Sequence, residues 1–167
     1  ERVSPTTHAL NIPLDQLAQA AAGLGSVNST PDVDGAIRRV PLEFALSEGK
    51  VRSLSARAAD WVAGNQYQGY GSQAHGVVRG GHSIPMDDSG RMLLLWHGDS
   101  SAYRRIPIWQ MICSIYPQQC DAGVEKFPPE FFADKIVLVG ASAAGSYDAH
   151  PTPFAEAAPG FIAHATA

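Results

Sequence analysis

The chain lacks a long apolar run, an excess of basic residues and a cysteine framework. No run of about 18 apolar residues occurs, so no segment is predicted to span a bilayer as a helix. Twelve Lys and Arg residues stand against sixteen Asp and Glu residues, which gives a net charge of −4. Nucleic-acid binding is therefore not expected, because contacts to a phosphate backbone require a basic surface.

Cysteine is scarce, with only Cys113 and Cys120 in the sequence. Two thiolates cannot make a four-ligand zinc site, and their CxxxxxxC spacing differs from the CxxC of a redox centre. A local disulfide or two free thiols remain. Because Pro117 lets the chain fold back from a helix around Cys113 toward Cys120, we predict a disulfide, which an oxidising compartment would allow.

The composition is that of a folded protein. With 45% apolar and 17% charged residues, 167 residues suffice for one hydrophobic core and one domain, residues 1–167. We expect the α/β class, with a mixed, partly antiparallel sheet flanked by three or more helices. The chain begins at Glu1 without a leader pattern and stops at Ala167 without a helix stop signal, so we expect it to be part of a longer protein.

Apolar residues at helical spacing predict three helices. The first follows Pro13, and the second is capped by Ser53. The third opens at Pro107 and stops at Pro117, because proline cannot continue a helix. The predicted apolar faces consist of Leu14, Leu17, Ala18 and Ala21; of Leu54, Ala58, Trp61 and Val62; and of Ile108, Met111, Ile112, Ile115 and Tyr116.

Turn residues and alternation mark the segments between these helices. Residues 31–35, Pro-Asp-Val-Asp-Gly, predict a tight turn. Beyond it, Leu42, Phe44 and Leu46 alternate with their neighbours, which predicts a half-buried strand. The Gly-rich, polar stretch 66–81 predicts a long loop.

Two further strand signals lie in the second half of the chain. Ile84 and residues 92–96 flank the turn-rich residues 87–91, so we predict two antiparallel strands joined as a hairpin. Residues 135–142, Lys-Ile-Val-Leu-Val-Gly-Ala-Ser, form a continuous apolar run rich in β-branched residues. Such a run is typical of a central strand, and we expect it to be buried on both faces.

Several of these segments together form a family pattern that runs from about residue 24 to residue 164. The blocks, in order, are Pro31-Asp-Val-Asp-Gly-Ala-Ile-Arg-Arg-Val-Pro-Leu42, Ile84-Pro-Met-Asp87 with Gly90-Arg91, Phe132-Ala-Asp-Lys-Ile-Val-Leu-Val-Gly-Ala-Ser142, and Asp148-Ala-His-Pro-Thr-Pro-Phe154 with Pro159-Gly160. This pattern resembles the type-two CHASE domains, sensory modules associated with cyclases and histidine kinases.

The resemblance implies a sensor domain on the periplasmic or extracellular side of a bacterial inner membrane protein. Membrane helices would flank it, and the cytoplasmic output would be an adenylate or guanylate cyclase, a histidine kinase, a diguanylate cyclase or a protein kinase. A small-molecule ligand or a periplasmic protein would supply the signal, and the full receptor is expected to be a homodimer. No cofactor is implied, and the Gly-rich loop and the cysteine pair depart from the family pattern.

The turn at residues 31–35 invites comparison with a calcium loop. Asp32 and Asp34 have the opening carboxylate spacing of such a loop, but Ala36 replaces the third ligand and Ile37 the obligatory glycine. Turn chemistry with Gly35 explains the segment better than a cation site, and we expect no metal.

Two arginines follow this turn. Because Arg38 and Arg39 alternate in direction along an extended chain, we expect one to face solvent and the other to reach Asp32 or Asp34. An internal ion pair is favoured over an anion site, and Arg38 is kept as a ligand-binding candidate.

The remaining ligand-binding candidates, Ser142, Asp148 and His150, follow the last predicted strand, where open α/β sheets tend to place their ligands. We expect no catalytic residue, because Ala144 breaks the Gly-x-Ser-x-Gly elbow around Ser142. The alternatives are a secreted α/β hydrolase, using Ser142 with Asp148 and either His150 or His164, and a structural dimerisation module.

Overall fold

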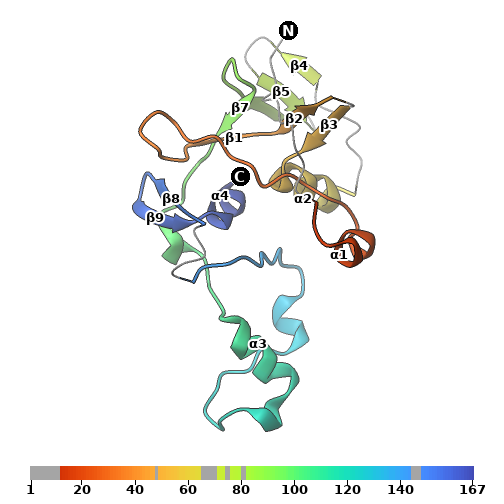
Figure 1. Cartoon of the computed structure of the whole chain (residues 1–167), viewed down its shortest axis with the longest axis vertical. Helices are drawn as coiled ribbons and strands as arrows, with labels where there is room; N and C mark the ends of the chain where they lie inside the picture. The colour runs from red at the N-terminus through yellow and green to blue at the C-terminus, as the bar shows by residue number, and fades with distance from the viewer. Residues whose placement is uncertain (1–11, 48, 65–70, 74–75, 80–81, 144–147) are drawn as a thin grey trace.

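The computed structural model describes residues 12–47, 49–64, 71–73, 76–79, 82–143 and 148–167 (Figure 1). Its α-helices are α1 (Asp15–Ala20), α2 (Leu54–Val62), α3 (Ile108–Ile115) and α4 (Phe161–Thr166), with 3-10 turns η1 (Ser100–Ala102), η2 (Pro117–Gln119) and η3 (Pro129–Phe132). Among these residues, no helix is both long enough and apolar enough to cross a membrane.

The strands form small antiparallel sheets. The pairs are β1 (Arg39–Pro41) with β7 (Arg91–Leu93), β2 (Glu43–Leu46) with β3 (Gly49–Arg52), β4 (Gly71–Gln73) with β5 (Gly76–Arg79), β5 with β6 (His82–Pro85), and β8 (Ala149–Thr152) with β9 (Ala155–Pro159). A parallel bridge joins Ser26 to Ser53. The single-domain, mixed α/β class is therefore confirmed.

A buried cluster joins strand β1 to the C-terminal helix. Ile37, Val40, Leu94 and Ala163 form it, and Met92 and Trp96 pack against it. The backbone N–H of Ile37 also donates to the Pro151 carbonyl at 2.9 Å, which ties the segment before β1 to β8. Because each large apolar side chain contributes about 1.5–3 kcal/mol when buried, the apolar cluster stabilises the arrangement of the turns that flank it.

Helix α2 begins where Ser53 predicts, but it buries a different face. The Ser53 hydroxyl oxygen accepts a hydrogen bond from the Ala56 backbone N–H at 3.3 Å. Ala56 and Asp60 are buried, whereas Trp61 and Val62 of the predicted apolar face are exposed. The prediction of that face was wrong, because the side of the helix with Ala56 and Asp60 packs inward, where Arg52 pairs with Asp60.

Helix α1 is also present, and its apolar face is exposed. Leu14 and Leu17 are both more than half exposed, and the helix contains no buried residue. The spacing of these leucines indicated a helix correctly, but it could not indicate whether another element covers them.

Two predictions about strand pairing were wrong. The stretch 66–81, expected as a loop, contains β4 and β5; residues 66–70, 74–75 and 80–81 lie outside the described part. The expected hairpin keeps its turn at residues 87–90, but Ile84 pairs with Val77 and Met92 pairs with Val40. A single bridge, Met86 to Met92, joins the two arms of that hairpin. Long-range partners thus compete successfully with the local pairing that the turn favours.

The predicted central strand at residues 135–142 is not a strand in the structure. Ile136, Val137 and Val139 are each more than half exposed, and no neighbouring strand pairs with this segment within the described residues. At Gly140 the segment lies against helix α4, since an added Cβ would be 2.4 Å from Cδ1 of Phe161. Apolar, β-branched composition favours an extended backbone, but burial needs a neighbouring strand, and composition cannot supply one.

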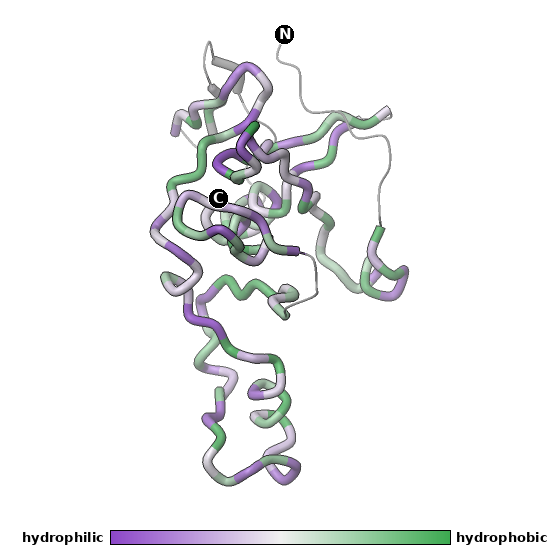
Figure 2. The backbone as a smooth tube through the Cα atoms, turned by 60° about the vertical axis from the view of Figure 1, so that its left-hand side comes forward, coloured by the Kyte–Doolittle hydropathy of each residue, from purple (hydrophilic) through white to green (hydrophobic). Residues whose placement is uncertain are grey.

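Helix α3 lies in an arm that extends away from the rest of the chain in both views (Figures 1 and 2). The helix runs as predicted from the residue after Pro107 to the residue before Tyr116. Cys113 and Cys120 form a disulfide with their Cα atoms 5.7 Å apart, within the roughly 4.4–6.8 Å that such a bond allows.

An aromatic cluster follows the disulfide in the chain. Phe127, Phe131 and Phe132 have ring centroids 4.9–6.5 Å apart. The Arg104 guanidinium lies over the first two rings and also pairs with Glu125 at 2.8 Å. These contacts close the arm on itself.

Candidate functional site

The site begins with the turn that follows Pro31. The backbone N–H of Gly35 donates to the Asp32 backbone carbonyl at 2.8 Å, and the backbone N–H of Asp32 donates to the Ala36 carbonyl at 3.0 Å. Gly35 has φ +82°, a conformation that glycine adopts without strain. The Asp34 carboxylate accepts a hydrogen bond from the Ala36 backbone N–H at 3.1 Å, so the side chain of Asp34 stabilises the turn.

A second turn, between β6 and β7, has the same kind of closure. The Asp87 carboxylate accepts from the Arg91 backbone N–H and from the Arg91 guanidinium, both at 2.9 Å. Strand β1 pairs with β7 so that Pro41 lies opposite Arg91. The sheet pairing therefore brings the second turn beside the first.

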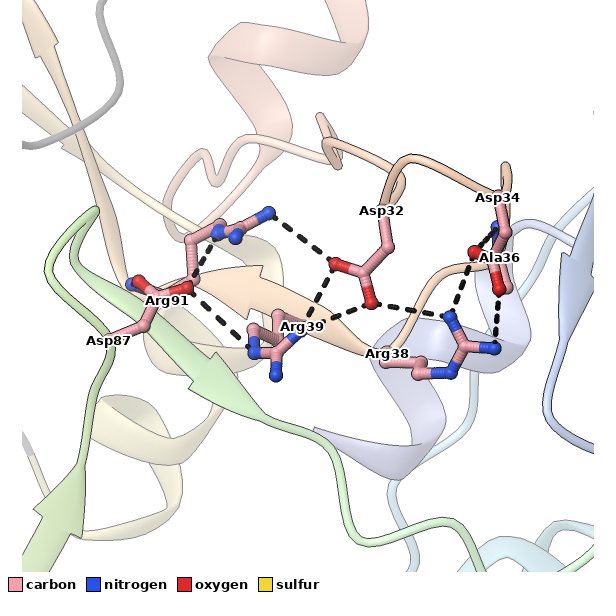
Figure 3. A network of polar contacts seen from close by, with 7 residues as sticks. All are labelled: Asp32, Asp34, Ala36, Arg38, Arg39, Asp87 and Arg91. Carbon is pink, nitrogen blue, oxygen red and sulfur yellow. Dashed lines mark hydrogen bonds and ion pairs between the residues drawn. The ribbon is translucent and has the colours of Figure 1, made fainter.

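Three arginines and three aspartates connect the two turns (Figure 3). Arg38 binds Asp34 through two hydrogen bonds of 2.9 and 2.8 Å and reaches Asp32 at 3.3 Å. Arg39 donates to both Asp32 oxygens at 3.1 and 3.0 Å. Asp32 thus accepts from two guanidinium groups, which makes it the centre of this network, hereafter the Arg–Asp network.

Longer ion pairs complete the Arg–Asp network. Arg39 lies 3.8 Å from Asp87, and Arg91 lies 3.7 Å from Asp32. The six formal charges cancel, so the network is a neutral bridge between the two turns. Both Arg38 and Arg39 enter it, and the expectation that one of them faces solvent alone was wrong. Arg38 precedes β1 instead of lying within it, so strict alternation does not apply to the pair.

The electrostatics of the network favour ionised carboxylates. The Arg38 guanidinium and the Ala36 backbone N–H lower the pKa of Asp34 to about 2. The Asp34 and Asp32 carboxylates in turn raise the pKa of Arg38. Burial acts to raise the pKa of Asp87, but hydrogen bonds from Arg91 and Ser89 outweigh it and hold that pKa below its usual value.

A surface depression of about 470 Å³ lies over the network. Its lining comprises Pro31, Asp32, Val33, Asp34, Arg38, Arg39 and Arg91. About a third of the Arg38 and Arg39 side chains is exposed, and both side chains line the depression.

Asp148 and His150 lie next to the turn of residues 31–36. His150 Nε2 and Asp148 Oδ1 are 3.5 Å apart, and both side chains are partly exposed. Asp148 directly precedes β8 and His150 lies within it, and β8 is joined to the segment after that turn by the Ile37–Pro151 hydrogen bond. The structure therefore brings these two candidates to the same region as Arg38, and their role in ligand binding remains a prediction.

Ser142 is placed differently. It is exposed, and within the described part of the chain it makes no hydrogen bond to Asp148, His150 or His164. Ala144, the residue that breaks the elbow motif, lies outside the described residues. A Ser-His-Asp arrangement for the alternative hydrolase is thus not assembled among the described residues.

His164 is a buried residue of α4. Its Nε2 lies 3.1 Å from the Val27 carbonyl oxygen, which links the C-terminal helix to the segment before the Asp32 turn. Burial lowers the pKa of His164, although the Val27 carbonyl and the charge of Asp148 oppose that shift. No group of three or more His, Cys, Asp or Glu side chains in the described ranges has the arrangement of a metal site.

Sequence reasoning missed Asp87 and Arg91 as members of the network. They were interpreted as turn residues of a local hairpin, and only the β1–β7 pairing brings them to Asp32. A signal was present, because both residues belong to the same block of the family pattern as Ile84.

The family model of the CHASE2 domain matches residues 3–167. Neither the curated proteins nor the solved structures that were compared include a match. Since the family model spans nearly the whole chain, the protein belongs to the CHASE2 family, whose members are extracellular sensory domains of receptors.

Proposed function

We propose that this chain is the signal-receiving domain of a transmembrane receptor whose cytoplasmic output is a cyclase or a histidine kinase. The observation that carries the proposal is the CHASE2 match over residues 3–167. The proposed location is the periplasmic or extracellular side of a bacterial inner membrane protein, with membrane segments outside this chain. A disulfide between Cys113 and Cys120 supports an oxidising compartment.

The Arg–Asp network is the proposed receiving site. It holds two turns together through ion pairs, and the partly exposed side chains of Arg38 and Arg39 line the depression above it. An anionic ligand that binds Arg38 competes with Asp34, whose side chain is about half exposed. The ligand then favours a conformation in which the turns are differently connected. It transmits a signal because it binds this conformation more tightly than the one that the ion pairs hold.

The experiment uses the full-length receptor in membranes, with cyclic nucleotide formation or histidine phosphorylation as the readout. Succinate and inorganic phosphate serve as anionic probes, and Arg38→Ala is compared with Lys50→Ala. Lys50 is a matched control, because it forms an exposed ion pair with Glu43 on β2–β3, away from the depression.

We expect at least one probe to change the output of the wild-type receptor and of Lys50→Ala, and to lose its effect in Arg38→Ala. If both variants respond to the probe as the wild type does, the Arg–Asp network is not the receiving site. If the chain fused to a topology reporter is found in the cytoplasm, the receptor proposal itself fails.

A further inference from the structure

Helix α3 has an apolar stripe that is exposed. Ile108, Ile112 and Ile115 have the i, i+4, i+7 spacing of one helix face, and Trp109 and Tyr116 flank them. These five side chains are 46–66% exposed. They define a surface that we term the α3 seam. Amphipathic helices normally bury such a stripe, and the described chain leaves this one uncovered.

The opposite side of α3 is fixed to the arm, so the helix cannot rotate to bury its seam. Cys113 is buried and bonded to Cys120. The Ser114 hydroxyl accepts from the Phe127 backbone N–H at 2.8 Å and donates to the Gln110 carbonyl at 3.0 Å. The arm itself extends away from the rest of the chain (Figures 1 and 2), which leaves the seam open to a partner.

We infer that the α3 seam pairs with the same seam of a second copy of this chain, with the two helices antiparallel. A four-then-three spacing of isoleucines is the repeat by which two helices interlock. If a two-fold axis passes near Ile112, Ile108 of one copy meets Ile115 of the other, and the two Ile112 side chains meet at the axis. The stripe is then complementary to itself.

Charge favours the antiparallel arrangement. Arg105 precedes α3, at the positive end of the helix dipole, and Asp121 follows Cys120, whose disulfide partner Cys113 lies in the last turn of α3; both charged residues are exposed. Antiparallel pairing sets Arg105 beside the last carbonyls and Asp121 of the second copy. Parallel pairing would set Arg105 against Arg105. No residue from Ile108 to Ile115 is charged, so electrostatic repulsion within the seam disfavours neither the parallel nor the antiparallel arrangement.

The size of the seam sets the expected strength. Eight helical residues span about 12 Å, and the surface that they bury is smaller than the ~800 Å² per partner of a standard interface. Dimerisation of the separate chain is therefore expected to be weak, and tethering to one membrane would strengthen it by raising the effective concentration. A lipid surface fits less well, because the polar side of α3, with Gln110 and Ser114, carries no basic residue.

The test is sedimentation equilibrium of the whole 167-residue chain over a wide range of concentrations. Wild-type chain is expected to show a reversible monomer–dimer equilibrium. Ile112→Arg, which places two like charges at the axis, is expected to raise the dimer dissociation constant by at least about thirtyfold. Leu17→Arg is the matched control, since it changes an exposed leucine on helix α1, and it should dimerise like the wild type.

Charge reversal tests the orientation. Arg105→Glu alone should weaken the dimer, and Arg105→Glu combined with Asp121→Arg should restore it if the helices are antiparallel. Far-ultraviolet circular dichroism of each variant verifies that the chain is folded, so that a loss of dimer reports on the seam.

The inference is overturned if the wild-type chain remains monomeric up to millimolar concentration, or if Ile112→Arg and the wild type dimerise equally. It is also overturned if the monomeric chain binds vesicles of three parts phosphatidylcholine to one part phosphatidylglycerol with a blue shift of Trp109 fluorescence that Ile112→Arg abolishes. Failure of this test leaves the proposed receptor function untouched, because that function is measured through the output of the full receptor.

Discussion

Arg52 and Asp60 form an ion pair in which the carboxylate is almost completely buried, with its side chain 2% exposed. Arg52 ends strand β3, and Asp60 lies on the inner face of α2, so the pair joins a sheet to a helix. A buried carboxylate without its cation is strongly disfavoured, because burial removes the water that would otherwise solvate the charge.

Arg52→Ala is therefore expected to lower the free energy of unfolding by about 3 kcal/mol. Lys50→Ala, which removes an exposed pair with Glu43 on the same hairpin, should cost less than about 1 kcal/mol. Urea unfolding monitored by tryptophan fluorescence gives both values. Equal losses of unfolding free energy in the two variants would mean that burial of Asp60 does not strengthen its ion pair.

Gly25→Ala is predicted to destabilise the chain through a backbone clash. A Cβ at residue 25 would lie 2.6 Å from the Leu54 Cα atom, and this approach is held by hydrogen bonds that Ser26 makes with Arg52 and Leu54, each 2.8 Å. We expect a loss of about 1–3 kcal/mol. Gly123→Ala is the control, since no heavy atom lies within 4 Å of its added Cβ, and it should leave stability nearly unchanged.

His164 is expected to make stability fall in mild acid. Because burial lowers the pKa of the folded-state imidazole, the unfolded chain binds a proton at higher pH than the folded chain. The free energy of unfolding should therefore decrease as the pH drops below about 6.5, and this contribution levels off below the folded-state pKa. Asp34, whose pKa is lowered to about 2, loses its stabilising contribution only below its ordinary value of 3.8, so the two effects separate.

Urea unfolding midpoints from pH 7.5 to pH 5 measure this effect. His164→Gln should flatten the dependence, whereas His97→Gln, at an exposed position, should keep it. If the unfolding midpoint of His164→Gln depends on pH as steeply as that of the wild type, other groups cause the pH dependence.

The disulfide is expected to limit local fraying without deciding whether the domain folds. Thiol titration of the denatured, non-reduced chain should find no free thiol. Changing both Cys113 and Cys120 to Ser should cost at most about 2–3 kcal/mol, because the closed loop is short. Complete unfolding of that variant at neutral pH would contradict the expectation.

Local chemistry was readable from the sequence wherever neighbours in the chain supply the interaction. The turn closed by Gly35 and Asp34, the Ser53 cap, the start of α3 after Pro107 and the Cys113–Cys120 pair each depend on residues a few positions apart. Steric limits and short hydrogen bonds act at that range irrespective of the remaining fold. The linked motifs also sufficed to identify the CHASE family.

Only the tertiary structure decided which faces are covered and which distant residues meet. The spacing of Trp61 and Val62, of Leu14 and Leu17, and of the α3 isoleucines indicates a helix in each case, but burial depends on what packs against it. The Arg–Asp network needs β1 to pair with β7, because that pairing carries Asp87 and Arg91 to Asp32. Strand pairing and burial are settled by competition among long-range contacts, and a pattern of residues along one segment contains only one side of each contact.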